Sequence, residues 1–595
     1  MCGFLGKISF NDIQSEDLFE ANKYLECRGP DSKCNYEINN QEINFNLIFN
    51  RLSILDLSSN ANQPMISKKY NSVLMFNGEI YNHKKLREEL MSSGCEFNTS
   101  HSDSEVVLNG LSMHGKDFIN KLDGQFGIFF VDLNKKKILL TRDRLGQKPL
   151  YYFLSKEDLI FSSNLISVIK TAKEYKFSNQ EIFNYINYGV INTPNTLFKN
   201  YKKLKPAEII EINFEKNKFD TKTTIYWKPE DFLDENEFDY EEFFELFSLA
   251  VSKRMTADVP IANFLSGGLD STAIVKNLND RKIKTNTFSV HLENKNYDES
   301  FWSNIVSNKY KTNHKSVLIS SNINNSDIFS SLDSLDEPYD DVSVVPSYLL
   351  SKEISKYYKV AISGDGGDEL LGGYKRTHLT MKDKNFFDQL ISKSYNFYPG
   401  IFGTGTNFKS RNKDIKISYK SFLEDVKLLN LLGIEAGSYD FTKYLDFNEI
   451  DKYKALLLAD YNYYLPEMMM YKVDRTSMAN SLEVRSPFVD HSLIEYIMSC
   501  NTDYFEVGNP KNIIKNYLSS DFESSFTNRS KRGFVFDVES WVYNNLNLID
   551  QTFKEGRVVI NLNKNIIKLL STRKTRINAS RIWKLFVLEN YISKI

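Results

Sequence analysis

A cysteine directly follows the initiator methionine in the opening segment MCGFLG. If the methionine is removed, Cys2 carries a thiol and a free α-amino group on one residue. The unperturbed pKa of an α-amine is about 8, so the amine can accept the thiol proton directly or through a water. Nucleophile and base would then belong to one residue, as in N-terminal nucleophiles. The alternative is that the position of Cys2 has no function.

A glycine-rich turn in the second half of the chain could bind phosphates. The segment FLSGGLDST, residues 264–272, places paired glycines and serines between an apolar strand and a helix. Glycines let the backbone approach an anion closely, and a helix N-terminus offers unpaired N–H groups. Asp270 would repel phosphates unless a cation lay between them, so we interpret it as a Mg²⁺ ligand. The segment lacks the Gly-Lys-Ser/Thr ending of a Walker A loop, and a structural turn with Asp270 as helix cap is the alternative.

A second turn of this kind follows about a hundred residues later, in AISGDGGDELLGGY (residues 361–374). Ser363 and Gly364 end a strand, and three carboxylates follow within five positions: Asp365, Asp368 and Glu369. Such crowding is costly unless a cation offsets it. We therefore expect Asp368 to be a second Mg²⁺ ligand opposite Asp270, with an acidic surface loop as the alternative.

Two cations lie three residues apart in YKVDRTSMANSLEVRSPF (residues 471–488). On a helix, Lys472 and Arg475 would share a face, and two cations on one face suit a triphosphate. The alternative is an ordinary solvated helix face. We interpret Arg485, beside Ser-Pro-Phe, as structural.

The elements that must position these residues differ between the two parts of the chain. In the first ~215 residues, short apolar runs separated by polar turns predict strands. A glycine-terminated helix with Leu86 and Leu90 on its apolar face is expected at 83–94. The predicted strands lie at 44–55, 72–80, 127–133 and 137–144, and Lys135–Lys137 is expected at a solvated hairpin tip. Strands with a few helices indicate a layered α+β domain.

The pattern becomes helical and α/β from about residue 240. A helix is predicted at 241–255, and strand-turn units at 261–278, 284–292 and 359–369. Strands that alternate with helices indicate a parallel sheet with ligands at the carboxyl ends of its strands. We expect domains at 1–215 and 241–595, an acidic linker at 216–240, and mainly helix at 380–470.

Composition limits the function classes. A chain of 595 residues is too long for one hydrophobic core. A formal net charge of −2 gives no support for a nucleic-acid or membrane-surface partner, and no apolar run approaches the ~20 residues of a membrane span. Five cysteines without C-x-x-C spacing indicate neither zinc nor a disulfide framework. Without a recognisable signal peptide, a reduced, cytoplasmic compartment is expected.

Taken together, these motifs resemble the glutamine-hydrolysing asparagine synthetases over nearly the whole chain. Two independent motif sets occur in the order found in that family. The N-terminal half is similar to a class II glutamine amidotransferase domain, which implies an αββα sandwich of the N-terminal-nucleophile type. The C-terminal half is similar to a synthetase domain of the ATP-pyrophosphatase group, which implies an α/β domain with a parallel sheet.

The resemblance implies roles for residues of a glutaminase site. Cys2 matches the nucleophile, and Asn77 and Gly78 in NGEIYNH match the oxyanion hole, through a side-chain amide and a backbone N–H. Arg51 matches the residue that grips the glutamine α-carboxylate, and Asp103 the acceptor of its α-ammonium. Other pocket residues are Leu52, Ser53, Ile54 and Glu79, with the segments Arg28–Asp31 and Arg142–Tyr152 as scaffold.

The resemblance also implies an ATP site. Leu265 and Val290 match contacts to the adenine, and Ser363 and Gly364 a second nucleotide contact. The pyrophosphate loop comprises Ser266, Gly267, Gly268, Asp270 and Ser271. Either Lys472 or Arg475 would be the basic phosphate contact. Many relatives carry glutamate where this chain has Asp365, a catalytic position in the second half-reaction.

The implied activity is ATP-dependent amide synthesis with Mg²⁺. Aspartate would be activated as an acyl-adenylate and amidated with ammonia from glutamine; a homodimer is a possible assembly. Two alternatives stay open. One is an amidotransferase of the same family acting on another carboxylate, such as a sugar acid of a surface polysaccharide. The other is a non-catalytic regulatory paralogue, against which the intact Cys2, Arg51, Asp103 and Asp270 argue.

Overall fold

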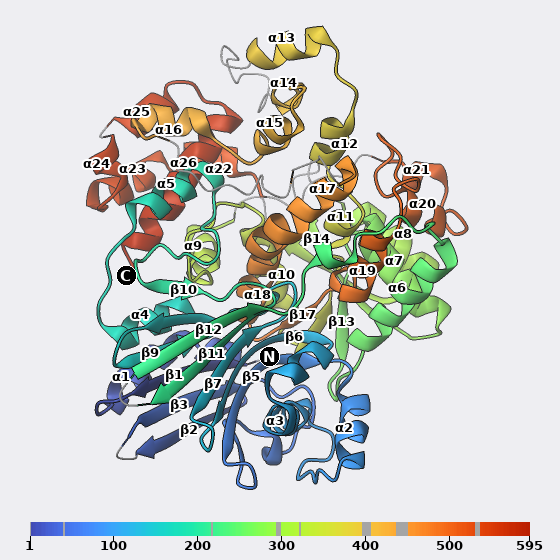
Figure 1. Ribbon diagram of the computed structural model, residues 1–595. Coiled ribbons are helices and arrows are strands. Elements are labelled where there is room, and N and C mark those ends of the chain that lie inside the picture. Colours follow the sequence, from blue (N-terminus) through green and yellow to red (C-terminus); the bar gives the residue numbers. More distant parts are fainter. Residues whose placement is uncertain are drawn as a thin grey trace.

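A strand-rich N-terminal half and a helix-rich C-terminal half pack against each other in the computed structural model (Figure 1). The structure describes residues 2–39, 42–215, 218–292, 299–319, 323–394, 406–435, 445, 450–529, 536–563 and 565–595.

The N-terminal half contains two six-stranded antiparallel sheets. The first has the order β10 (Tyr201–Lys203), β8 (Tyr151–Leu154), β9 (Asp158–Ser162), β1 (Gly3–Ser9), β3 (Asn44–Arg51), β2 (Ser32–Asn39). The second has the order β12 (Lys218–Ile225), β11 (Glu208–Glu215), β7 (Lys137–Arg142), β6 (Gly124–Asp132), β5 (Ser72–Ile80), β4 (Met65–Ser67). Four of these strands, β3, β5, β6 and β7, confirm the predicted ones. The expected hairpin tip is confirmed for Lys135 and Lys136, which lie in the turn between β6 and β7, whereas Lys137 is the first residue of β7.

Side chains of the central strands alternate between two cores. Phe4 and Met75 lie in the core between the two sheets, whereas their neighbours Leu5 and Phe76 lie in the outer cores, under helices. Burial on both faces explains why these strands are continuously apolar. The outer helices are α1 (Ser15–Ala21) and α4 (Leu165–Ala172) on one side and α2 (His83–Ser92) and α3 (Asp103–His114) on the other. The layers confirm the αββα sandwich.

The expected linker at 216–240 is wrong for residues 218–225, which form β12. This strand pairs with β11 along its whole length, from Glu208↔Ile225 to Glu215↔Lys218. The sequence of β12 is rich in Lys, Thr and Asp, so it does not show the apolar pattern from which strands are predicted. An edge strand that is exposed on one face can form with few apolar residues.

The C-terminal half is built on a five-stranded parallel sheet. Its order is β15 (Asn313–Ile319), β14 (Asn286–Leu292), β13 (Ile261–Phe264), β16 (Val360–Ile362), β17 (Glu483–Arg485). The chain runs outward from β13 to β15 and then returns to β16 on the other side of β13. This reversal is a topological switch point, where loops at the carboxyl ends of neighbouring strands diverge and leave room for a ligand.

Helices cover both faces of this sheet. Those in the sheet domain are α6 (Tyr240–Arg254), α7 (Leu269–Asp280), α8 (Ser300–Tyr310), α9 (Asn325–Asp333), α10 (Val344–Ile354), α11 (Gly367–Leu370), α18 (Tyr471–Met478), α19 (His491–Ser499), α20 (Asn512–Leu518) and α21 (Ser524–Thr527). The remaining helices are α12 (Lys375–Met381), α13 (Phe386–Ser394), α14 (Thr406–Lys409), α15 (Ile415–Lys420), α16 (Val426–Leu432), α17 (Lys452–Ala459), a π-helix (Asp460–Met470), α22 (Val538–Asn544), α23 (Leu546–Glu555), α24 (Val559–Leu562), α25 (Ile566–Ser571) and α26 (Arg576–Ile592). The helical character expected for 380–470 is confirmed, except for 395–405, 436–444 and 446–449, which lie outside the described residues.

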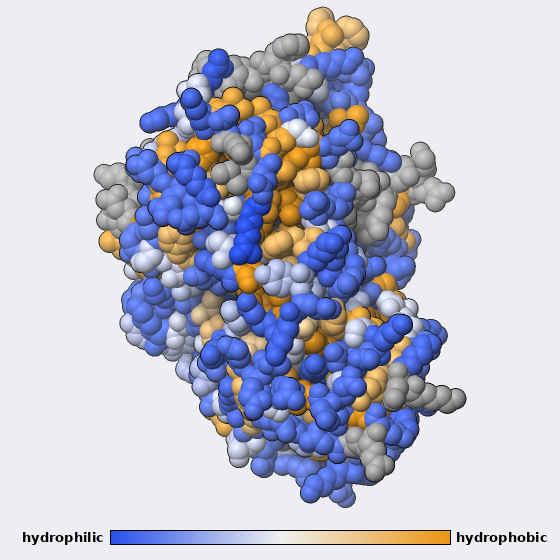
Figure 2. Space-filling model, turned by 90° about the vertical axis from the view of Figure 1, so that its left-hand side faces the viewer, coloured by the Kyte–Doolittle hydropathy of each residue, from blue (hydrophilic) through white to orange (hydrophobic). Residues whose placement is uncertain are grey.

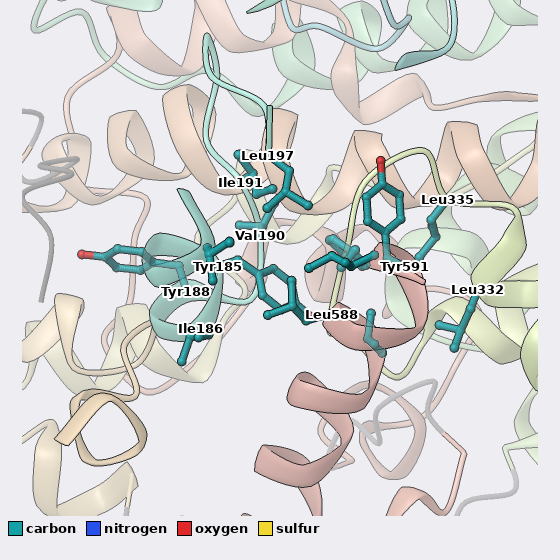
Figure 3. Close-up of a cluster of buried hydrophobic side chains, with 14 of the residues drawn as sticks. Tyr185, Ile186, Tyr188, Val190, Ile191, Leu197, Leu332, Leu335, Leu588 and Tyr591 are labelled. Atoms are coloured by element: carbon teal, nitrogen blue, oxygen red, sulfur yellow. The ribbon is translucent and has the colours of Figure 1, made fainter. Parts of the chain in front are cut away.

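The two halves share a hydrophobic core. Tyr185 and Ile186 of α5 (Asn179–Tyr188) pack with Leu332 of α9 and with Leu588 and Tyr591 of α26 (Figure 3). The Tyr185 hydroxyl also donates to the carbonyl oxygen of Lys584 at 3.0 Å. Because apolar side chains of both halves fill one core, the halves are held in a fixed relation to each other.

Hydrophilic side chains cover much of the face in Figure 2, with hydrophobic ones exposed in its upper half. Helix α13, at the top of Figure 1, exposes Phe386, Phe387 and Leu390 by 65%, 70% and 50%. Among the described residues, no helix has the length and apolar character needed to cross a membrane.

Candidate functional sites

A cavity in the N-terminal half contains Cys2. Its wall is formed by Cys2 immediately before β1, the end of β3, the following loop, β5, the start of α3 and the start of β17. The lining residues are Cys2, Arg51, Leu52, Ile54, Leu55, Ala61, Gln63, Phe76, Gly78, Glu79, Asp103, Ser104 and Glu483. The structure therefore brings together seven of the residues expected there; Ser53 and Asn77 are not in the wall.

Asn77 lies against Cys2 from behind the cavity wall. The backbone nitrogen of Cys2 donates to Asn77 Oδ1 at 3.0 Å, which fixes the side-chain amide. Its other end, Nδ2, is buried and has no hydrogen-bond partner among the described residues. A buried donor without a partner is costly, so a donor left open beside a nucleophile is suited to a negatively charged oxygen.

The next residue of β5 has no space for a side chain. A Cβ on Gly78 would lie 2.0 Å from the carbonyl oxygen of Gln125 on β6. Only glycine therefore allows the two strands to pair at this point. The close pairing holds the backbone of residues 77–79 rigidly beside Cys2.

The guanidinium of Arg51 is engaged by the loop after β3. Its Nη1 donates to the Ser58 carbonyl oxygen at 2.8 Å and to Asn62 Oδ1 at 2.9 Å, and Nη2 donates to the carbonyl oxygens of Leu55 and Asp56. These bonds orient Arg51 at the cavity. They also use the Nη donors that a bidentate contact with a carboxylate would need. A carboxylate could therefore bind to Arg51 in this way only if it replaced some of these loop contacts.

Two buried carboxylates line the same cavity. Asp103, at the start of α3, accepts from the Ile80 backbone at 3.1 Å, and Glu79 pairs with Arg485 at 3.0 Å. Burial raises the pKa of both carboxyls, and the charges of His83 near Asp103 and Arg485 near Glu79 only partly oppose this. A cationic group bound between them would stabilise both ionised forms.

The C-terminal half contributes a wall residue that sequence reasoning missed. Glu483 of β17 lines the Cys2 cavity, and its carboxylate accepts from Arg485 Nε at 2.6 Å. Burial alone would raise the pKa of Glu483, but Arg485 holds it at about 2. Arg485, expected to be structural, thus joins carboxylates of both halves, Glu79 and Glu483. No local signal could have placed Glu483 beside a residue 481 positions away.

The second site lies at the switch point of the parallel sheet. The segment after β13 and the segment after β16 meet there, because glycines after β16 leave space for Asp270 at the start of α7. A Cβ on Gly364 would lie 2.9 Å from Asp270 Cβ, and one on Gly367 would lie 2.7 Å from Asp270 Oδ1. The two motifs therefore form one site, as expected from their positions at adjacent strands.

A lysine from a third segment lies between the two expected metal ligands. The ammonium nitrogen of Lys511 is 2.5 Å from Asp270 Oδ2 and 2.7 Å from Asp368 Oδ1. Lys511 immediately precedes α20, in a segment without a recognisable motif, and sequence reasoning missed it. The two carboxylates lie close enough for one cation to bridge them, and carboxylate oxygens are donors suited to Mg²⁺.

The turn after β13 has the geometry expected of a phosphate loop. Gly267 has φ +75°, a conformation that favours glycine, and α7 begins directly after Gly268 without a side-chain cap. Ser266 and Ser271 lie 3.2 Å apart through their hydroxyls. Arg529, a further missed residue, donates to the Gly267 carbonyl oxygen at 2.7 Å and also pairs with Glu299 at 3.5 Å.

Strand pairing places the other expected nucleotide contacts at the same edge of the sheet. Leu265 follows the end of β13 and its backbone nitrogen donates to the Phe288 carbonyl oxygen, whereas Val290 lies on the neighbouring β14, two residues before that strand ends. Ser363 is held from β17, because its backbone nitrogen donates to the Arg485 carbonyl oxygen and its hydroxyl lies 3.0 Å from that of Ser486. Asp365 follows in the same turn and is half-buried.

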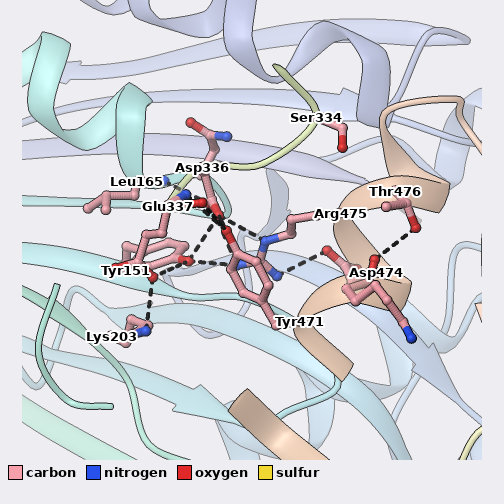
Figure 4. A network of polar contacts seen from close by, with 12 residues as sticks. Tyr151, Leu165, Lys203, Ser334, Asp336, Glu337, Tyr471, Asp474, Arg475 and Thr476 are labelled. Carbon is pink, nitrogen blue, oxygen red and sulfur yellow. Dashed lines mark hydrogen bonds and ion pairs between the residues drawn. The ribbon is translucent and has the colours of Figure 1, made fainter. Parts of the chain in front are cut away.

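Helix α18 confirms the expected helix around Lys472 and Arg475, but its two cations have different partners. Arg475 donates to Asp336 at 3.0 Å and to the Tyr151 hydroxyl at 2.7 Å, in a buried network at the boundary of the halves (Figure 4). Lys472 donates instead to the Ser343 hydroxyl at 3.0 Å. These contacts do not support Arg475 as a phosphate contact, and they leave Lys472 as the candidate.

A second group of potential metal ligands carries its own counter-ions. Asp123, Asp490 and His491 offer ligand atoms within 4.8 Å of one another. Lys253 is already 2.7 Å from Asp123, and Arg254 is 2.8 Å from Asp490. An additional cation there would meet two positive charges, so this cluster is an ion-pair network between the halves.

Comparisons with known proteins agree with this two-site arrangement. The glutamine amidotransferase domain model matches residues 1–227, and the asparagine synthase model matches residues 242–591. The chain belongs to the asparagine synthase family. Its Cys2 cavity lies within the first match and its switch-point site within the second.

The chain is similar to several proteins of this family along most of their length. It is 28% identical over 576 residues to asparagine synthetase [glutamine-hydrolyzing] 1 of Bacillus subtilis, covering 92% of this chain and 89% of the relative. It is 32% identical over 418 residues to putative asparagine synthetase [glutamine-hydrolyzing] 2 of Methanocaldococcus jannaschii, covering 66% of this chain and 78% of the relative.

Proposed function

We propose that the protein is a glutamine-dependent asparagine synthetase with two reaction centres. In the first, glutamine is hydrolysed to glutamate and ammonia. In the second, ATP activates the β-carboxylate of aspartate as an acyl-adenylate with release of pyrophosphate, and ammonia displaces AMP to form asparagine.

The residues at the Cys2 cavity account for the first reaction. Once the α-amine is free, it takes the thiol proton, and the Cys2 sulfur attacks the carboxamide carbon of glutamine. Asn77 Nδ2 and the Gly78 N–H stabilise the oxyanion, and Asp103 accepts the substrate's α-ammonium. Ammonia leaves as a thioester forms, and water then releases glutamate. Leu52 and Ile54 supply the apolar part of the pocket.

The residues at the switch point account for the second reaction. The backbone of the turn after β13 and the α7 N-terminus bind the phosphates, and Leu265 and Val290 contact the adenine. Asp270 and Asp368 would hold Mg²⁺, which neutralises charge on the leaving pyrophosphate. Asp365 acts in the attack of ammonia on the acyl-adenylate.

The observation that carries this proposal is the position of Glu483. It lies on a strand of the synthetase sheet and in the wall of the cavity that contains Cys2. This contact brings the synthetase half directly to the place where ammonia forms. Ammonia released into solution would mostly be protonated, so the proposal includes an interior route between the two sites.

A paired assay tests the proposal. The purified protein is incubated with glutamine, ATP, Mg²⁺ and aspartate, and glutamate, pyrophosphate and asparagine are measured together. Equal amounts of the three products support the proposal. The proposal is contradicted if no pyrophosphate is released and if glutamate forms at the same rate with and without ATP and aspartate.

A second candidate acceptor is favoured by one residue. Asp365 is one methylene shorter than the glutamate of many relatives, which changes the space beside the adenylate and supports a carboxylate other than aspartate. Pyrophosphate release is therefore measured with ATP and each of a series of amino acids and sugar acids, and the amide product is identified by mass spectrometry. Release with a sugar acid and none with aspartate would replace the first candidate by the second.

A further inference from the structure

The Lys511 side chain forms a bridge between the two reaction-centre turns. Its ammonium group contacts Asp270 in the first turn of α7, after β13, and Asp368 on α11, after β16, at 2.5 and 2.7 Å. Each distance is that of a direct ion pair. Lys511 itself is buried, with 6% of its surface exposed, so water does not screen these contacts strongly.

The surrounding backbone is shaped to admit this side chain. A Cβ on Gly373 would lie 2.2 Å from Lys511 Cε and 2.3 Å from Asp368 Oδ1. Lys511 also has φ +56°, which glycine or asparagine would adopt at a lower cost than lysine. The absence of a side chain at Gly373 therefore leaves the space that the Lys511 side chain occupies beside Asp368.

A divalent cation and the Lys511 ammonium cannot share this position. The carboxylates of Asp270 and Asp368 carry two negative charges. The Lys511 ammonium lies between them and neutralises part of this charge. An ion bound to both carboxylates would lie within a few ångströms of the ammonium, and like charges at that distance repel strongly. The ammonium must move before a metal can bridge Asp270 and Asp368.

We propose that Lys511 occupies the metal position of the nucleotide-free protein, so that a divalent cation enters this site only together with a nucleotide. The phosphates of the nucleotide supply the negative charge that the ammonium loses when it leaves the two carboxylates. Lys511 is thus a positioning residue for the metal. This inference rests on the proposed assignment of Asp270 and Asp368 as metal ligands.

Mn²⁺ binding without nucleotide tests the inference. Free Mn²⁺ is titrated by electron paramagnetic resonance into the wild-type protein and Lys511→Met, with no ATP, glutamine or acceptor present. We expect the variant to bind one Mn²⁺ at least about tenfold more tightly, because a competing buried charge is removed. Equal Mn²⁺ affinities of the two proteins would overturn the inference. So would the binding of one Mn²⁺ by the nucleotide-free wild type, if Asp270→Asn abolished that binding.

Matched variants separate this effect from others. Lys515→Met makes the same substitution one turn further along α20, where the lysine bonds to Asn509, and should leave Mn²⁺ binding unchanged. Combining Lys511→Met with Asp270→Asn should abolish the increase in Mn²⁺ affinity. If the increase persisted in the double variant, the ion would bind elsewhere and the inference would be rejected. Lys511→Arg retains the charge and should bind Mn²⁺ as weakly as the wild type.

A measurement on the wild type alone keeps the inference testable if Lys511→Met is unstable. Mn²⁺ affinity should rise at least about tenfold when a non-hydrolysable ATP analogue saturates the protein. An unchanged affinity would count against a displaced ammonium. Because none of these titrations requires turnover, they are independent of whether aspartate is the acceptor.

Discussion

Arg28 connects the backbone of Cys2 to a helix of the other half of the molecule. Its Nη1 and Nη2 donate to the two carboxylate oxygens of Asp474 at 2.9 and 3.1 Å, and its Nε donates to the Cys2 carbonyl oxygen at 3.2 Å. Burial would raise the pKa of Asp474, but Arg28, Lys148 and Arg475 hold it below its usual range. Asp474 lies on α18, so Arg28 connects that helix directly to the backbone of the nucleophile.

Arg28→Lys should weaken the coordination of the two reactions. Lysine retains the charge but cannot form the bidentate contact, and loss of a hydrogen bond to a charged group costs about 1.5–3 kcal/mol of stability. We expect a lower melting temperature and more glutamate than amide formed per turnover. Arg411→Lys is the control, since that pair with Asp388 is exposed and should have little effect. A one-to-one product ratio in Arg28→Lys would contradict the role in coordination.

Cys2→Ala should abolish glutamine-dependent synthesis and preserve ammonia-dependent synthesis. The thiol lies in the N-terminal cavity, whereas the acyl-adenylate would form at the parallel sheet. Amide formation is measured with glutamine and with ammonium chloride as the nitrogen source. If both activities fell together, the division of labour between the two sites would be wrong.

Asn77→Asp should reduce the kcat of glutamine hydrolysis roughly 10²–10³-fold, with little change in KM. The substitution keeps the oxygen that accepts from the Cys2 backbone and removes the buried Nδ2 donor. Asn71→Asp, in the exposed turn before the same strand, is the matched control. An unaltered kcat would exclude Nδ2 from the oxyanion site.

Asp270→Asn should stop pyrophosphate release and leave glutamine hydrolysis largely intact. The substitution removes one of two carboxylates that would hold the metal and leaves the ion pair between Lys511 and Asp368 in place. Glutamate and pyrophosphate are measured on the same sample over a Mg²⁺ titration. Normal pyrophosphate release at low Mg²⁺ would exclude Asp270 as a ligand.

Glu79→Gln should change how stability depends on pH. Burial raises the pKa of Glu79 above its unfolded value, although Arg485 opposes this, so the native state binds a proton that the unfolded chain releases. The stabilising contribution of this proton is present below the unfolded pKa and is lost as pH rises through the folded pKa. We therefore expect the melting temperature of Glu79→Gln, relative to the wild type, to be higher at pH 8 than at pH 5. A difference that is constant from pH 5 to pH 8 would show that Glu79 ionises normally.

Sequence patterns predicted the local structure around both sites. Strand β5 occupies residues 72–80, as predicted, because an apolar run is bounded by turn residues. The turn after β13 begins α7, because a glycine pair there follows a short buried strand. In each case the signal lies within about twenty residues of the chain, where backbone preferences and side-chain period decide the outcome.

Tertiary packing decided which charged groups meet. Sequence reasoning paired Lys472 with Arg475 on one helix face, but the buried carboxylate of Asp336 and the Tyr151 hydroxyl engage Arg475 at the boundary of the halves. A buried cation binds the anions that the fold places around it, whatever its neighbours in sequence. The partners of Arg475 lie 139 and 324 positions away.

The sequence by itself determined the two motif sets, the strands and helices that carry them, and the residue types available for chemistry. Only the tertiary structure placed Glu483 in the cavity of Cys2 and Lys511 between Asp270 and Asp368. The physical reason is that local periodicity reports which face of an element is buried, but not what it is buried against. Contacts between distant segments follow from how whole sheets and helices pack, and no short stretch of this sequence contains that information.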